Sequence, residues 1–140
     1  MALRYLLDTN AVSEWVKPTP DATVLKSLQR HHDARAIAAP TLQELAYGFA
    51  RLAPGKRRDQ LELWLNELAQ RLPVLPFDAQ AAWWLGVERA RLGRVGIQLP
   101  HVDGEIAAVA QTAQLVLVAR NVKDFERIEG LVVECWHATA

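Results

Sequence analysis

Leu6-Leu7-Asp8-Thr9-Asn10 is the stretch that decides the fold of this 140-residue sequence, because an apolar run ends there in a carboxylate, a hydroxyl and an amide. A short apolar run that stops at a polar turn is typical of a buried strand. We therefore predict a strand over residues 3–8, with Asp8 at its carboxyl end. Ligand sites of open α/β sheets lie beyond the carboxyl ends of the strands, so Asp8 is the first candidate site residue.

The rest of the chain alternates short apolar segments with longer amphipathic ones. Strands are predicted over 36–39, 74–77, 115–119 and 131–133, and helices over 10–17, 21–32, 41–52, 56–71, 78–92, 103–113 and 121–127. This alternation indicates a mainly parallel central sheet with helices on both faces, a three-layer α/β/α sandwich. The length suits one core, so residues 1–140 are expected to form a single domain.

Bulk composition narrows the class of protein. Lys plus Arg and Asp plus Glu both number 16, so overall charge does not predict a nucleic-acid partner. The single cysteine, Cys135, has no partner for an internal disulfide, which favours a reducing compartment. No stretch approaches the roughly 20 apolar residues of a membrane span, and Arg4 and Asp8 interrupt the first apolar run. We expect a cytoplasmic protein that does not enter a membrane.

Several polar residues lie either just after a predicted strand or in the first turn of a predicted helix. They are Asp8, Glu44, Asp103 and the pair Asn121 and Asp124. Crossover helices return the chain across a parallel sheet, so these places share one edge. Clustered carboxylates repel one another unless a cation neutralises them, and ligands that are all oxygen suit Mg²⁺ or Mn²⁺. The pattern predicts a divalent-metal site that can act on a phosphodiester.

The same residues also fit purely structural roles at helix starts. Thr41-Leu42-Gln43-Glu44 matches the capping box, in which the Glu44 side chain accepts from the backbone amide of Thr41. Asp103 would favour the positive end of its helix. The remaining positions fit N-caps or first-turn acids, namely Asp8, Thr9, Asn121 and Asp124. These roles explain each residue separately but not their shared edge.

Four segments together resemble the PIN-domain ribonucleases, in particular the toxins of VapBC and Fit-type toxin–antitoxin pairs. They are 6–10 with Ser13 and Glu14, 42–48, 103–110 and 117–125, and their order and spacing match across essentially the whole chain. The resemblance implies a Mg²⁺- or Mn²⁺-dependent endoribonuclease with a PIN-like fold. It assigns metal binding to Asp8 and Asp103, and a metal-binding or water-positioning role to Glu44.

The fourth corner of the implied site departs from the family pattern. Some relatives carry an acid at the position of Asn121, whereas others carry Asn there and the acid at the position of Asp124, as this chain does. Ala119 replaces a Thr found in many relatives, so a hydroxyl is missing but no carboxylate is lost. We take Asp124 as the fourth catalytic and metal-binding residue, with Asn121 as the alternative residue that would complete the site.

The resemblance implies in-line attack on the phosphate by a water that Glu44 or Asp103 orients. Thr9 and Asn10 are expected to fix Asp8 and to contact the phosphate or the waters on the metal. Arg120 and Lys123 are expected to hold the RNA backbone, and Asn121 is expected to lie beside the site. For Arg120 and Lys123 a solvated charged turn is the alternative. The RNA of such enzymes is typically single-stranded or in a loop, where its backbone is accessible.

The resemblance also implies protein partners. These are a second copy of the chain in a homodimer and a cognate antitoxin that inserts an Arg or Lys toward the acids, with promoter DNA reached only through the antitoxin. Trp15 is a candidate contact for a partner segment. Trp83 and Trp84 are adjacent and cannot both face inward, and an outward aromatic suits an interface.

Two other classes of function stay open at this point. A non-catalytic PIN-like module would bind RNA or protein without cleavage, and the loss of the hydroxyl at Ala119 leaves room for it. A Mg²⁺ phosphatase or phosphotransferase with Asp8 as nucleophile would usually have a second acid two residues later, where this chain has Asn10. A Mn²⁺ titration separates the enzyme from the binding module, because the module need have no acid-dependent site.

Overall fold

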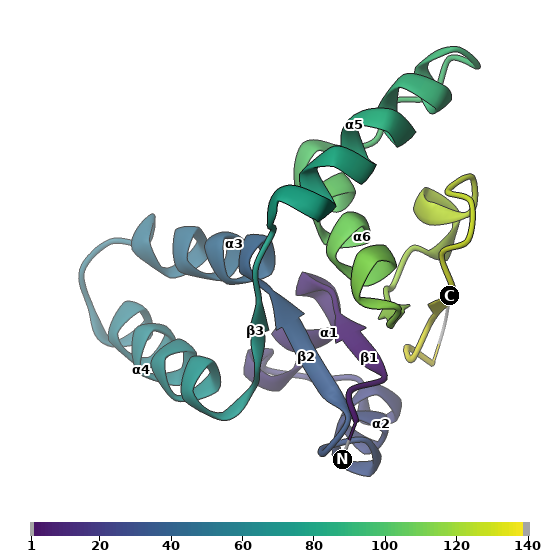
Figure 1. The fold of residues 1–140 in the computed structure, drawn as a ribbon. Helices are drawn as coiled ribbons and strands as arrows, with labels where there is room; N and C mark the ends of the chain where they lie inside the picture. Colours follow the sequence, from purple (N-terminus) through teal and green to yellow (C-terminus); the bar gives the residue numbers. More distant parts are fainter. Residues whose placement is uncertain (1, 139–140) are drawn as a thin grey trace.

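The computed structural model describes residues 2–138, and within them one sheet has five parallel strands in the order β3-β2-β1-β4-β5 (Figure 1). The strands are β1 Tyr5–Leu7, β2 Arg35–Ala38, β3 Val74–Leu75, β4 Val116–Val118 and β5 Val133–Glu134. β1 is central, and its Leu6 pairs with Ala36 of β2 and Leu117 of β4. Asp8 therefore follows the middle strand of the sheet.

Helical segments connect the strands. They are α1 Thr9–Ser13, the 3-10 helix η1 Glu14–Val16, α2 Ala22–Arg30, α3 Ala39–Ala50, α4 Lys56–Arg71, α5 Ala79–Gly93, α6 His101–Ala113 and the 3-10 helix η2 Val122–Phe125. None of the helices within residues 2–138 is long and apolar enough to cross a membrane.

The two faces of the sheet are buried in separate clusters because side chains alternate along each strand. Leu6 of β1 packs in one cluster with α6 and Leu92 of α5. Tyr5 and Leu7 pack in the other, against apolar side chains of α1, α2 and α4. The predicted three-layer α/β/α sandwich is confirmed.

Several predicted boundaries differ from the structure. The helix expected over 10–17 divides into α1 and η1 and ends before the extended residue Lys17, because the residue before a proline disfavours helical geometry. The last strand is Val133–Glu134 rather than 131–133, since its register follows the pairing of Leu117 with Val133. The segment expected as a helix over 121–127 is a short 3-10 turn.

Candidate active site

Asp8 is a buried acid at the carboxyl end of the central strand. Its backbone amide donates to the carbonyl of Val118 at 2.9 Å, and its carboxylate accepts from the amide of Ala11 at 2.9 Å, which makes it the N-cap of α1. Burial raises the pKa of Asp8 to about 6, and the Asp103 charge adds to this, although the amides of Ala11, Arg120 and Asn10 act in the opposite direction. The predicted N-cap role of Asp8 is therefore correct, and the carboxylate is also one that readily takes up a cation or a proton.

Glu44 is not part of a capping box. α3 begins at Ala39 with Ala38 as its N-cap, so Thr41 lies inside the helix and its buried hydroxyl has no hydrogen-bond partner. Pro40 in the first turn explains the early start, because its fixed φ suits that position. Instead, the Thr9 hydroxyl donates to a Glu44 carboxylate oxygen. We expected Thr9 to fix Asp8, and it fixes Glu44.

Asp103 lies in the first turn of α6, which begins two residues earlier than predicted, at His101. The side chain is half-buried. Burial raises the pKa of Asp103, and the charges of Glu44 and Asp124 raise it further. The charges of acids on α3 and η2 thus raise the pKa of Asp103 on α6, and the charge of Asp103 in turn raises the pKa of Asp8.

These acids do not form a closed metal cage. Within residues 2–138, no three Asp, Glu, His or Cys side chains lie close enough together to hold an ion by themselves. The chemistry of the donor set nevertheless fits Mg²⁺, which usually keeps several waters and is bound through one or two carboxylates plus substrate phosphates. A divalent cation would relieve the repulsion among the carboxylates and the desolvation of Asp8. The site therefore suits an open metal centre that substrate completes.

The remaining predicted residues lie at the solvent side of this edge. Asn10, Arg120, Asn121, Lys123 and Asp124 are all exposed. Asn121 occupies the N-cap position of η2, but its side chain makes no capping hydrogen bond. Its expected alternative role as a side-chain cap is therefore wrong, and its amide is free to face a ligand.

A profile of the PIN domain matches residues 5–131. The chain belongs to the PIN-domain family. It is 35% identical over 135 residues to the tRNA(fMet)-specific endonuclease VapC of Salmonella typhimurium, covering 96% of this chain and 98% of the relative. It is 31% identical over 136 residues to the toxin FitB of Neisseria gonorrhoeae, covering 94% of this chain and 98% of FitB.

Solved structures agree with this assignment. The structure of VapBC2 from Rickettsia felis bound to a promoter DNA fragment superposes with a TM-score of 0.83 at 29% identity, covering 97% of this chain and 99% of the other. The DNA-bound VapBC of Salmonella typhimurium gives a TM-score of 0.83 at 32% identity, covering 96% and 98%. The PIN-domain toxins of VapBC and Fit pairs are thus its structural as well as its sequence relatives.

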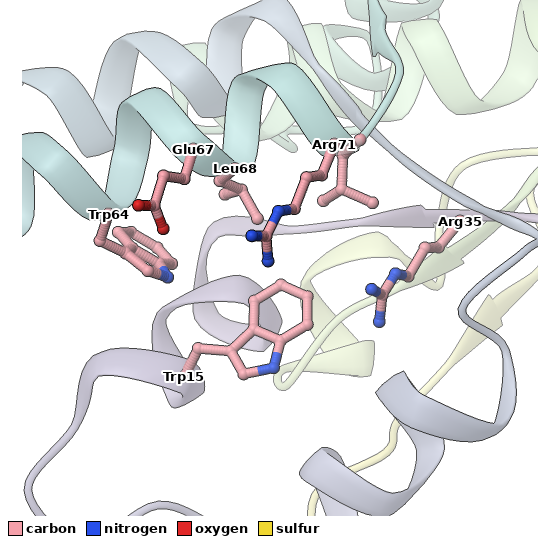
Figure 2. Close-up of a pocket in the computed structure, with 7 residues that line it drawn as sticks. Trp15, Arg35, Trp64, Glu67, Leu68 and Arg71 are labelled. Carbon is pink, nitrogen blue, oxygen red and sulfur yellow. The ribbon is translucent and has the colours of Figure 1, made fainter.

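Two adjoining hollows of this PIN domain form what we call the α3–α4 groove. The first, of about 290 Å³, extends from Thr9 and Glu44 across Leu61 to Trp64. The second, of about 370 Å³, continues from Trp64 to Trp15 and basic side chains of β2 and α4. Figure 2 shows the two indole rings and the guanidinium groups of Arg35 and Arg71 around this second hollow. The groove connects the acids to an aromatic and basic surface.

Two further features concern residues outside the acids. Trp83 of α5 is 79% exposed, whereas Trp84 packs against the core, so the prediction that the two face apart is confirmed. Glu14 is only 2% exposed and has no role in the predicted site. It accepts from the amide of Asp21 at 2.8 Å, from Lys17 at 2.6 Å and from His137 at 3.1 Å. The signal that was missed is an acid within the mainly apolar residues 11–16, a pattern typical of a buried and paired carboxylate.

Proposed function

We propose that this PIN domain is a Mg²⁺- or Mn²⁺-dependent endoribonuclease and the toxin of a toxin–antitoxin pair. The observation that carries the proposal is the buried Asp8 carboxylate, with its raised pKa, next to the charge of Asp103 at the carboxyl edge of the central strand. A buried acid beside a second acid is a costly arrangement that a bound cation makes favourable. The endonuclease relatives support the assignment.

The four acids have different proposed roles, according to their positions in the site. We assign Asp8 and Asp103 to hold the ion, with Glu44 and Asp124 as the flanking acids. When bound, the ion supplies positive charge that polarises the scissile phosphate and stabilises the charge that develops on it. Asp8 has little freedom to move because its Oδ1 accepts from the Ala11 amide. It therefore presents its carboxylate in a fixed orientation.

Glu44 is the residue we assign to orient the attacking water. The Thr9 hydroxyl holds one of its carboxylate oxygens, which leaves the other to accept a hydrogen bond from a water in line with the leaving oxygen. We assign RNA backbone contacts to the exposed Arg120 and Lys123, and contacts to the phosphate to Asn10 and Asn121. Bases in single strands or loops leave the backbone accessible to such an edge.

Cleavage of total cellular RNA by the purified chain, free of antitoxin, tests this function. Reactions contain Mg²⁺, Mn²⁺ or EDTA, beside Asp8→Asn and Asp103→Asn, and calorimetry with Mn²⁺ runs in parallel. We expect metal-dependent cleavage and Mn²⁺ binding that both substitutions abolish. Cleavage that survives both substitutions would contradict the site assignment. Mn²⁺ binding without cleavage would favour a binding module, and a folded wild type without either would exclude the metal-dependent nuclease.

We further propose that a cognate antitoxin occupies the α3–α4 groove. The groove leads to Glu44, and its end near the acids is lined mainly by apolar and aromatic side chains together with Arg57. Its other end also carries Arg35, Glu67 and Arg71. An apolar segment would fill the end near Glu44 while a cationic side chain approached the acids. Relatives have been solved as VapBC complexes, some of them bound to DNA. Promoter DNA would be contacted through the antitoxin.

The exposed face of α5 supports a homodimer. Trp83 and Val87 are one helical turn apart, and 79% and 61% of their respective surfaces are exposed. Adjacent large apolar side chains on one helix face are typical of an interface. We propose that two copies pair through this face, and that the protein acts in the cytoplasm, consistent with its single unpaired Cys135.

A further inference from the structure

Arg89 of α5 binds the backbone at the entry to α6. Its guanidinium donates to three consecutive carbonyls, those of Leu99 at 2.8 Å, Pro100 at 3.4 Å and His101 at 3.0 Å. These residues lead into the helix turn that holds Asp103. One side chain therefore joins α5 to the backbone just before an acid of the site.

The entry to α6 is held by the apolar contact of Leu99 with the core, and its polar support is sparse. Pro100 is the N-cap and provides no side-chain cap. The preceding residues 93–96 are exposed, and Gly96 has a φ of +79°. Hydrogen bonds from a charged donor are about twice as strong as neutral ones. Arg89 is thus a principal anchor of this segment.

Helix electrostatics does not explain the position of Arg89. The N-terminus of a helix carries partial positive charge, so a cation there is unfavourable unless other groups compensate. The three carbonyls provide that compensation. The geometry indicates that Arg89 is there to hold the backbone.

Gly104 provides the space that the guanidinium occupies. A Cβ at this buried position would lie 2.9 Å from the Arg89 Cζ and closer still to Nη2. Any residue other than glycine would therefore push the flexible Arg89 side chain away from the carbonyls. Asp103 supplies the acid, and the adjacent Gly104 leaves space for the Arg89 guanidinium that holds the backbone before Asp103.

We propose that Arg89 is a positioning residue for the metal site, which holds the entry to α6 so that Asp103 remains at the carboxyl edge beside Asp8. The inference rests on the proposed function, because it takes Asp103 to be a metal-binding acid. Residues that orient metal ligands typically change metal affinity 10- to 100-fold when replaced. Arg89 acts through the backbone and does not contact the reacting atoms.

The test measures the Mn²⁺ dissociation constant by calorimetry for Arg89→Met and Gly104→Ala, with far-UV circular dichroism to establish that each variant is folded. We expect both variants to bind Mn²⁺ about 10- to 100-fold more weakly. The double variant should be no weaker than the worse single one, because both changes remove the same contact. Amide hydrogen exchange at residues 101–104 should become faster in each variant.

Arg94→Met is the matched control. Arg94 is an exposed arginine at the C-cap of the same helix, away from the entry to α6. This variant should leave the Mn²⁺ dissociation constant unchanged. A wild type that binds Mn²⁺ while Arg89→Met and Gly104→Ala bind it equally well would overturn the role of Arg89 alone. A wild type that binds no Mn²⁺ would overturn the proposed function and, with it, this role.

Discussion

At the scale of single residues, Asp8 is both the N-cap of α1 and a buried acid. Its carboxylate caps α1 by accepting from Ala11, yet only 8% of the residue is exposed and its pKa is raised to about 6. The carboxylate of an ordinary N-cap is solvated, so its charged form does not carry the free-energy cost of desolvation. The stability of the metal-free protein should therefore report the state of this one group.

The first prediction is that Asp8→Asn stabilises the metal-free protein at alkaline pH. The pKa of Asp8 rises from 3.8 to about 6 on folding, so the folded state binds more protons between these values. Stability is then lost as the pH rises through this window, by up to about 3 kcal/mol at pH 8. Asn keeps the acceptor for Ala11 and cannot ionise. Urea unfolding in EDTA at pH 4.5 and pH 8 measures the difference.

Asp59→Asn is the control for this pH dependence. Asp59 is an exposed acid in the first turn of α4, and its replacement should change stability by no more than about 0.5 kcal/mol at both pH values. An Asp8→Asn variant that is less stable than wild type at pH 8 would contradict the claim that desolvation dominates at this site. Added Mn²⁺ should stabilise wild type and leave Asp8→Asn unchanged.

The positions of the acids at one sheet edge could be predicted from the sequence, but their contacts could not. An apolar run before Asp8, and the return of helices to one sheet edge, are local and topological properties that the sequence reveals. The bond from Thr9 to Glu44 joins residues 35 positions apart, and it depends on how α1 packs against α3. Local patterns instead favoured a capping box at Thr41, because they do not distinguish a helix that begins at Pro40 from one that begins after it.

At the scale of elements, Glu14 attaches the last described residues to the start of the chain. It accepts from His137, while Asp21 accepts from the amide of Ala138 at 2.9 Å. Burial raises the pKa of Glu14, but hydrogen bonds from Lys17, the Asp21 amide and His137 outweigh it, so its pKa lies below 4.5. The stabilisation is present above pH 4.5 and lost as the pH falls through the lowered value.

The second prediction is that Glu14→Ala destabilises the fold by about 3 kcal/mol or more at pH 7. The change leaves a buried histidine and a backbone amide without their acceptor, which is the costly way to break a buried pair. Urea unfolding measures it, with the exposed Glu62→Ala of α4 as control. The destabilisation should shrink at pH 3, and a loss that is constant with pH would contradict the role of the ionised carboxylate.

Elements whose ends depend on distant partners were the ones predicted least well. The apolar residues 131–133 predict the position of β5 only in part, because pairing with β4 places Val133 and Glu134 in the sheet. By contrast, α4 was predicted over the residues it occupies, 56–71, because Gly55 and Pro54 precede it and its periodicity continues to the end. Boundaries set by local sequence are predictable, and boundaries set by tertiary pairing are not.

At the scale of the whole molecule, the alternation of strands and helices was enough to predict the three layers. The α3–α4 groove was not predicted, because it depends on the separation between α4 and η1 rather than on either segment. Its lining joins residues as far apart in the sequence as Trp15 and Arg71. Function at this scale therefore depends on surfaces that only the assembled fold defines.

The third prediction concerns the groove. Leu61→Glu should weaken binding of the cognate antitoxin at least 10-fold, because it places a charge on the apolar lining between Glu44 and Trp64. Leu63→Glu is the matched control on the same helix, since Leu63 is 61% exposed and does not line the groove. Surface plasmon resonance with immobilised antitoxin compares them. Equal binding by both variants would place the antitoxin elsewhere.

The last prediction concerns assembly through α5. In a two-fold dimer each side chain of the interface contributes twice, and an aromatic anchor is typically worth about 2 kcal/mol or more. Trp83→Glu should therefore raise the dimer dissociation constant about 1000-fold and give monomers in sedimentation equilibrium. Val132→Glu, at a position 58% exposed just before β5, should leave the dimer intact. A wild type that sediments as a monomer, or a Trp83→Glu variant that remains dimeric, would move the interface away from this face of α5.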